Sequence, residues 1–300
     1  MVQKKETLFN PQAVNDLINK VKGESVLAKL TNQDAIGFNG NEYFTFDFEN
    51  EIDIVAEGGA KSHGGIKVEP ITVVPLKVEY GARVTDEFMY ASEEKQLAIL
   101  QNFNEGYAKK LAKGLDIMAF SGTNPRTGTD STVIGDNNFA DKITQEITFD
   151  AATADDNLED AVAAVVGADG DVTGAALSTL FGASLAKIEN GAGVAMYPEF
   201  KFGGNPGTLG ALPVELSKNV SINSKIEGVV GDFRNMFKYG ITKQIPLTVI
   251  PYGDPDNSGR DLAGHNEVYL RAETYLGWGI LSADSFAKIT EAEAEAGAGE

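Results

Sequence analysis

The chain has 300 residues, of which 44 are acidic and 25 are lysine or arginine, so its formal net charge is −19 at pH 7. A surface this acidic repels phosphate backbones and anionic lipids, which argues against DNA binding through a basic face. The sequence contains no cysteine and two histidines, which argues against disulfides, thiolate ligands and a histidine-rich metal site, and no apolar run approaches the ~20 residues of a membrane span.

The first 40 residues are predicted to form a polar N-terminal arm with one short amphipathic helix. Asn10 followed by Pro11 is typical of a helix start, because Asn caps the first turn and Pro suits the first helical position. Gly23 then ends the helix. Its apolar residues recur at helical spacing: Val14, Leu17, Ile18 and Val21. The opening residues MVQKKETLFN are polar, so we expect no signal peptide.

Two strand-like segments flank a glycine-rich stretch, EGGAKSHGGIK, at residues 57–67. Apolar and polar residues alternate on both sides, as in strands with one apolar face. The apolar positions are Phe44, Phe46, Phe48, Ile52 and Ile54 before it, and Val74, Leu76, Val78, Tyr80, Ala82 and Val84 after it. The pattern predicts a long hairpin with a glycine-rich tip. Because an isolated hairpin is marginally stable in water, we expect it to lie against another surface, such as a neighbouring subunit.

The longest predicted helix runs from Ser92 to about Phe120. Apolar residues recur there every three or four positions: Leu97, Leu100, Phe103, Tyr107, Leu111, Leu115 and Met118. Gly106 and Gly114 interrupt the pattern, at about 1 kcal/mol each relative to Ala. At ~1.5 Å per residue the helix is about 40 Å long, which exceeds the width of a small compact domain. We therefore expect a structural spine.

The remaining elements follow in short segments and then in long strands. Helices are predicted over 157–166 and 174–188, and short strands within 209–220 and 228–237. Period-two alternation then predicts two long strands, joined by a turn-rich loop, over 237–249 and 268–280. The last ten residues, EAEAEAGAGE, have the composition of a disordered acidic tail.

Lys61-Ser62 after glycines prompts a test for a phosphate-binding loop. The motif G-x-x-x-x-G-K-[ST] requires glycines at the positions where this chain has Val55 and Ala60. The residues that follow are strand-like, whereas a phosphate loop continues into a helix. The spacing therefore argues against a nucleotide site.

The sequence supports calcium binding and catalysis no better than it supports a nucleotide site. The segments DGDVTG (169–174) and DPDNSG (254–259) begin like EF-hand loops, but neither has the bidentate glutamate at the twelfth position, so solvated turns are the simpler interpretation. His63 and His265 lie in predicted loops, and the sequence has no G-x-S-x-G elbow. We expect no cofactor, no metal and no enzymatic activity.

The ordered set of segments resembles the major capsid protein of tailed bacteriophages, with the Hong Kong 97-like capsid fold. The likeness covers roughly residues 40 to 290. Its motifs are Glu57-Gly58 in the hairpin, the turn from Val84 to Glu87, the long helix, and then Gly122, Pro125 and Gly128. Further on, LGALPVELSKNV, GDFRNMFKYGI and NEVYLRAETYLGWGILSADSFAKI are similar to later segments of that family.

The resemblance implies an α+β fold in which an arm and an extended hairpin, the E-loop, reach neighbouring subunits. A peripheral domain would hold the spine helix, and an axial domain would meet its copies at five- and six-fold axes. The implied divisions are an N-terminal arm at 1–40, the E-loop at 41–84, the peripheral domain at 85–150 and 237–290, the axial domain at 151–236, and the acidic tail at 291–300.

The resemblance also implies a function. Hexamers and pentamers of the chain would close an icosahedral shell around packaged viral DNA, without sequence-specific DNA binding. A separate scaffolding protein, a portal and a decoration protein are expected partners, with assembly in the host cytoplasm and the virion as the final location. The expected E-loop tip residues are Glu57, Gly58, Gly59, Lys61, Gly64, Gly65 and Lys67, and the expected spine residues are Leu97, Leu100, Tyr107, Leu111 and Leu115.

Glycine at the hairpin tip would let the tip change shape, and its lysines would meet acidic neighbours. Two other interpretations stay open. An encapsulin, a cellular compartment shell of the same fold, would bind a cargo peptide inside. An acidic soluble α+β enzyme with carboxylate chemistry would be a monomer or small oligomer with a deep cleft. Large closed shells would favour the capsid protein or the encapsulin over the enzyme.

Overall fold

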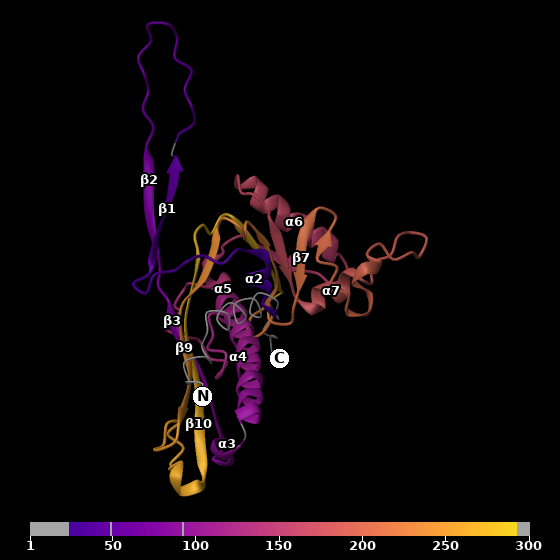
Figure 1. The fold of residues 1–300 in the computed structure, drawn as a ribbon. Coiled ribbons are helices and arrows are strands. Elements are labelled where there is room, and N and C mark those ends of the chain that lie inside the picture. Colours follow the sequence, from indigo (N-terminus) through magenta and orange to yellow (C-terminus); the bar gives the residue numbers. More distant parts are fainter. Residues whose placement is uncertain (1–23, 49, 92, 293–300) are drawn as a thin grey trace, which may run out of the picture.

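A computed structural model describes residues 24–48, 50–91 and 93–292 of the protein. The helix predicted between Asn10 and Gly23, and the acidic tail from residue 293 onward, lie outside these residues. Figure 1 shows a central body of helices and sheets, a long hairpin that extends from one end, and long strands that extend towards the other. Helix and sheet are thus combined in one chain, as the sequence predicted.

The longest strands form a three-stranded antiparallel sheet with the order β3-β10-β9. Its strands are β3 (Leu76–Thr85), β10 (Glu267–Ile280) and β9 (Phe237–Ile250). Trp278 pairs with Tyr239 across the sheet and both are buried, which confirms the two C-terminal strands predicted from alternation. Helix α4 (Glu93–Ser121) lies along this sheet (Figure 1), and its bounds agree with the predicted spine helix to within one residue.

A second sheet of six strands has the order β4-β11-β8-β5-β7-β6. Its strands are β4 (Glu146–Phe149), β11 (Phe286–Glu291), β8 (Ile226–Gly231), β5 (Gly174–Leu177), β7 (Leu212–Leu216) and β6 (Thr208–Leu209). Helices α6 (Ala154–Gly167) and α7 (Thr179–Leu185) share a core with it. Its pairs are antiparallel except β11 with β4 and β5 with β7, which are parallel.

The helix predicted over 174–188 is wrong in its first part. Residues 174–177 form β5, and α7 begins after Ser178, whose side-chain oxygen accepts a hydrogen bond from the amide of Phe181. All four residues of β5 are buried between β8 and β7, and a short apolar run suits a central strand as well as a helix. The acidic tail predicted over 291–300 is wrong at its first residue, because Glu291 is the last residue of β11.

Strand pairing crosses the domain boundaries expected from the sequence. Strand β4 comes from the segment 85–150 and β11 from 237–290, yet both lie in the sheet whose other strands come from 151–236. Ala287 and Ile289 of β11 are fully buried in the core beneath α6 and α7. The segments expected to be peripheral therefore supply one edge of the six-stranded sheet.

The predicted hairpin is present, but its second strand is not the one expected. Strand β1 (Asn41–Phe48) pairs antiparallel with β2 (Ile66–Val73). Residues 76–85, expected to complete the hairpin, form β3 and pair with β10 instead. Pro75 separates the two strands, and because Pro has no N–H it suits a break between ladders.

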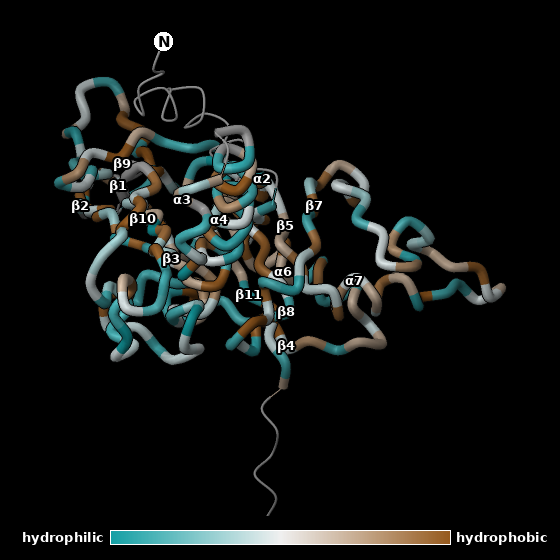
Figure 2. The backbone as a smooth tube through the Cα atoms, turned by 60° about the horizontal axis from the view of Figure 1, so that its bottom comes forward, coloured by the Kyte–Doolittle hydropathy of each residue, from teal (hydrophilic) through white to brown (hydrophobic). Residues whose placement is uncertain are grey.

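The short helical elements connect these parts and help to fill the core. They are α2 (Val26–Leu30), α3 (Glu87–Tyr90), α5 (Phe139–Lys142), and the 3₁₀ helices η2 (Pro198–Gly203) and η3 (Ala263–His265). One core packs α2, α4 and α5 against β9 and β10. Figure 2 shows hydrophobic and hydrophilic residues alternating along the coil of α4, as expected of a helix with one buried face. None of the described helices is both long and apolar enough to cross a membrane.

Candidate assembly surfaces and internal anchors

The base of the hairpin is fixed to the body by hydrogen bonds. Asn41 Nδ2 donates to the carbonyl of Ala35 over 2.7 Å, and its Oδ1 accepts from the amide of Gly37 over 2.9 Å. The Tyr43 hydroxyl donates to a carboxylate oxygen of Asp34 over 3.2 Å, and burial is the largest cause that raises the pKa of Tyr43. These bonds set the direction in which β1 leaves the body.

Two glycines of β10 receive the other strand of the hairpin. Val73, at the end of β2, has 2% of its surface exposed and lies over Gly279, where an added Cβ would come within 2.4 Å of Val73 Cγ2. An added Cβ at Gly277 would lie 3.3 Å from Cα of Pro75. The hairpin is therefore seated in a socket that has no room for side chains on β10.

Beyond this base the hairpin exposes apolar side chains. Ile52 and Ile54 have 97% and 94% of their surface exposed, and the other exposed members are Phe44, Val55, Ile66 and Val68. In the described chain β1 and β2 pair with one another and with no further strand. Apolar surface is worth about 25 cal/mol per Å² when it is removed from water. A surface outside this subunit would gain that free energy by covering the hairpin.

The tip residues expected from the sequence lie in the connection between β1 and β2 and in β2 itself. Gly58 has φ +78°, and the amide of Gly59 donates to the carbonyl of Ala56 over 2.9 Å in a tight turn. The amide of Gly65 donates to Asn50 Oδ1 over 3.2 Å. The remaining members, Glu57, Lys61, Gly64 and Lys67, are exposed. The tip is thus closed by bonds between its own residues.

The spine helix divides into an exposed first half and a buried second half. Tyr107, Leu111 and Leu115 are buried in the core, and Leu100 packs against it, whereas the side chain of Leu97 lies outside the described part. The Tyr107 hydroxyl donates to Thr274 Oγ1 of β10 over 2.7 Å. Burial raises the pKa of Tyr107 to about 12, so this donor stays protonated. This polar bond and the apolar contacts around it therefore hold the helix to the sheet.

Asp116, which the sequence did not single out, is a buried carboxylate on α4. It accepts from Ser25 Oγ over 2.6 Å and from Asn219 Nδ2 over 2.9 Å. It also accepts from the amides of Val26 and Leu27, at the start of α2. Burial raises its pKa to about 6, although all four hydrogen bonds favour the charged form. Asp116 joins the end of the N-terminal arm to the spine.

Arg83 forms a second charged cluster that the sequence did not reveal. Its guanidinium bonds Asp254, Asp256 and Glu267 at 2.5–2.9 Å and also donates to the carbonyl of Arg260. Glu267 is paired with Arg260 as well, and Arg260 and then Arg83 are the causes that lower the pKa of Glu267. This cluster closes the loop between β9 and β10 onto β3.

The same loop contains one of the segments tested above for calcium. Asp254 accepts from the amides of Ser258 and Gly259 over 3.0 and 2.7 Å and from Arg83. The cation beside this carboxylate is therefore a guanidinium. In the part of the chain that the structure describes, no three His, Cys, Asp or Glu side chains gather into a group able to hold a metal ion.

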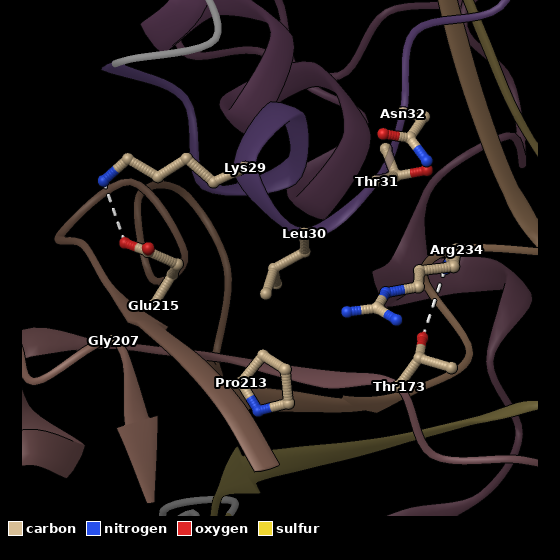
Figure 3. A pocket seen from close by; sticks show the side chains of 9 residues that line it. All are labelled: Lys29, Leu30, Thr31, Asn32, Thr173, Gly207, Pro213, Glu215 and Arg234. Atoms are coloured by element: carbon tan, nitrogen blue, oxygen red, sulfur yellow. Dashed lines mark hydrogen bonds and ion pairs between the residues drawn. The ribbon is translucent and has the colours of Figure 1, made fainter. Parts of the chain in front are cut away.

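A polar cavity of about 390 Å³ lies between α2, β7 and the turn after β8. Lys29 and Glu215 form an ion pair of 2.8 Å at one side, and Arg234 extends its guanidinium into the other (Figure 3). The backbone amide of Arg234 donates to Thr173 Oγ1 over 3.2 Å. Two cations and one carboxylate suit an anionic side chain better than acid–base catalysis.

The sequence and the fold were compared with those of known proteins, and both find similar proteins among phages. The sequence matches the model of the phage capsid family over residues 7–290. A solved chain from Mycobacterium phage Ogopogo has 32% identity and a TM-score of 0.77, and the match covers 90% of this chain and 92% of that one. A chain from Gordonia phage Cozz has 21% identity and a TM-score of 0.74, with 90% and 87% covered. None of the curated proteins compared with the sequence matches it.

A further solved structure, the capsid of an empty GTA particle, has 15% identity and a TM-score of 0.61, with 90% of each chain covered. At that identity the likeness shows the fold alone. The family model and the 32% identical phage chain both span most of the sequence. The chain belongs to the phage capsid family.

Proposed function

We propose that the chain is a major capsid protein that self-assembles through hexamers and pentamers into an icosahedral shell around packaged viral DNA. Its role is structural and not enzymatic. The observation that carries this proposal is the hairpin of β1 and β2, which extends from the body with its apolar side chains exposed and pairs with no other described strand. A monomer gains nothing from such a surface, whereas an assembly buries it.

The proposed site is the tip of this hairpin, the E-loop, which reaches a neighbouring subunit. Gly58 and Gly59 allow the tip to change shape, and Lys61 and Lys67 meet acidic surface on the neighbour. The positive φ of Gly58 and the exposure of the tip residues support this role. The arm, peripheral and axial divisions remain part of the proposal. The three-stranded sheet with α4 is the peripheral core, and the six-stranded sheet, which includes the edge strands β4 and β11 from the peripheral segments, is the axial core.

The remaining partners follow from the same proposal. A separate scaffolding protein, a portal and a decoration protein would take part in building the head, in the host cytoplasm, and the finished chain would reside in the virion. The net charge of −19 supports enclosure of DNA without binding its sequence, because an acidic wall and a phosphate backbone repel one another.

Removing the tip tests the proposal. Residues 49–65 are replaced by Asn-Gly, so that a two-residue turn joins Phe48 to its cross-strand partner Ile66. We expect a folded subunit with an unchanged melting temperature, since the hydrogen bonds found at the tip among the described residues join its own residues. We expect no shells by negative-stain microscopy. A second variant keeps the full length and changes Ile52 and Ile54 to Ser, which should weaken assembly and leave the fold intact. Shells formed by the tipless chain at wild-type concentrations would contradict the proposal.

A further inference from the structure

The polar cavity between α2, β7 and the turn after β8 joins parts of the chain that are far apart in the sequence. Its lining comes from residues 29–32 at the end of α2, from Thr173 before β5, from residues between 207 and 215, and from Arg234 after β8. Its volume of about 390 Å³ lies within the range of small-molecule sites, which is about 300–1,000 Å³. A ligand bound here would therefore contact α2 and the six-stranded sheet together.

Arg234 brings a cation into this cavity that no described carboxylate neutralises. Its guanidinium extends towards Leu30 and Pro213 (Figure 3), and within the described chain no hydrogen bond or ion pair joins it to another residue. Asp232, two residues earlier, already accepts from Thr173 Oγ1 over 3.0 Å and from Asn235 Nδ2 over 2.8 Å. Because arginine keeps its charge in proteins, the partner that this side chain lacks is an anion.

The backbone fixes the position of Arg234 although its guanidinium is free. The amide of Arg234 donates to Thr173 Oγ1 over 3.2 Å, and Lys238 Nζ donates to its carbonyl over 3.3 Å. Thr173 is fixed in turn by Asp232, which has 3% of its surface exposed. Since the base of the side chain is already held by a buried network, less conformational freedom is lost when the guanidinium binds a ligand.

Further donors line the cavity from the end of α2. Asn32 contributes a side-chain amide that has no hydrogen-bond partner among the described residues. Lys29 is paired with Glu215 over 2.8 Å, and Asn205 Nδ2 donates to the same oxygen of Glu215 over 2.9 Å. Two cations and one carboxylate give the described lining a net charge of +1, in a chain whose net charge is −19. The cavity is thus a local exception to the acidic surface.

We propose that this cavity binds a free oxyanion of the phosphate type, which joins α2 to the six-stranded sheet. The guanidinium of Arg234 presents its donors in a fork that fits two phosphate oxygens. Lys29 lies on the opposite side of the cavity, and Asn32 comes from the end of α2 (Figure 3). A carboxylate has two oxygens in one plane, whereas the oxygens of a phosphate point in four directions and suit donors on several sides. The inference concerns the single subunit and does not depend on shell formation.

Titration calorimetry of the unassembled full chain with inorganic phosphate tests the inference. We expect one saturable site per chain, with a dissociation constant in the millimolar range or lower. Phosphate should also raise the melting temperature, because a ligand that binds the native state stabilises it. Acetate at the same ionic strength should bind roughly tenfold more weakly or worse. The absence of saturable phosphate binding, or equal binding of acetate, would overturn the inference.

Three variants assign the binding to the cavity. Arg234→Gln should weaken phosphate binding roughly tenfold or more, because a hydrogen-bonded charge is lost, and should leave the melting temperature without phosphate unchanged. Glu215→Gln removes the carboxylate that repels an anion and should strengthen binding. Arg126→Gln, which removes an exposed arginine outside the lining, is the matched control and should change nothing. Wild-type affinity in Arg234→Gln, or weaker binding by Glu215→Gln at an unchanged melting temperature, would contradict the site.

Competition separates the free anion from two other occupants. Duplex DNA at the same concentration of phosphate groups should not displace inorganic phosphate, because a chain of net charge −19 repels the backbone. Displacement that requires Arg234 would assign the cavity to nucleic acid and overturn the inference. A chain truncated after residue 292 lacks the last glutamates of the sequence and should bind phosphate as the wild type does. Tighter binding by the truncated chain would assign the cavity to the acidic tail instead.

Discussion

Asp116 shows how one buried charge can join separate parts of the chain. Four donors converge on it, from Ser25, Val26, Leu27 and Asn219. Asp116→Ala would leave these donors without an acceptor in a buried site. We expect the free energy of unfolding to fall by about 3 kcal/mol, because each unsatisfied buried donor is costly. Urea denaturation of the unassembled subunit measures it, and an unchanged midpoint would show that water replaces the carboxylate.

The same residue gives stability a pH dependence. Burial raises its pKa from 3.8 to about 6 in the folded chain, so between those values the native state binds more protons than the unfolded state. Its contribution is therefore fully present below the unfolded pKa and is lost as the pH rises through about 6. The loss is about 3 kcal/mol, since one pKa unit is worth about 1.4 kcal/mol. The wild type should show this slope relative to Asp116→Asn, and parallel curves would contradict it.

Arg83 is expected to stabilise the loop between β9 and β10 locally. It is bound by Asp254, Asp256 and Glu267, which otherwise repel one another. Arg83→Met should release the loop between β9 and β10, so that amide hydrogen exchange at Ser258 and Gly259 accelerates while the core stays protected. The exposed Arg126 provides the matched control, Arg126→Met, which should leave exchange in this loop unchanged. Unaltered protection in the first variant would mean that the loop holds its shape without the cation.

At the scale of elements, the seating of the hairpin on β10 can be tested by a double-mutant cycle. Gly279→Ala places a methyl group 2.4 Å from Val73 Cγ2, and we expect it to lower the free energy of unfolding by about 1–3 kcal/mol. Val73→Ala in the same chain removes the colliding atom. The double variant should therefore lose less than the sum of the two single variants. Additive losses in urea denaturation would show that the two residues do not share a contact.

The elements that the sequence predicted best are those set by local pattern. The long α4 and the strands β9 and β10 follow from apolar spacing sustained over many residues. The partner of a strand is a different matter, because β3 alternates as a hairpin strand would but pairs with β10, nearly 200 residues away. Likewise the run at 174–177 suits a helix or a buried strand equally, and only its neighbours in the sheet decide.

The candidate site divides along the same line. The glycine-rich tip is visible in the sequence because a cluster of glycines between two alternating segments favours a turn. The anchors are invisible there, since Asp116 meets Ser25 and Asn219 from distant segments, and Gly279 is one glycine among 33 until Val73 is placed over it. The sequence also does not predict that Phe200 is buried while Phe202 is exposed at a positive φ. Apolar spacing reveals neither the sign of φ nor which of two nearby rings faces solvent.

For the whole molecule, charge and apolar surface act in opposite directions on assembly. Every copy carries −19, so copies in a shell repel one another, while the hairpins gain free energy when they are covered. Salt separates these effects, because the Debye length falls from about 30 Å at 0.01 M to about 8 Å at 0.15 M. We expect the concentration needed for assembly, followed by light scattering, to fall as salt rises over this range.

The tip lysines give this prediction its control. If Lys61 and Lys67 meet acidic surface on a neighbour, changing both to Gln should raise the concentration needed for assembly at low salt, where that attraction is least screened. The difference from wild type should then shrink as salt is added, because screening removes the attraction while apolar burial at Ile52 and Ile54 persists. Less assembly of the wild-type chain at higher salt would contradict the prediction. It would mean that ionic attraction between subunits outweighs both their repulsion and the apolar contact of the hairpin.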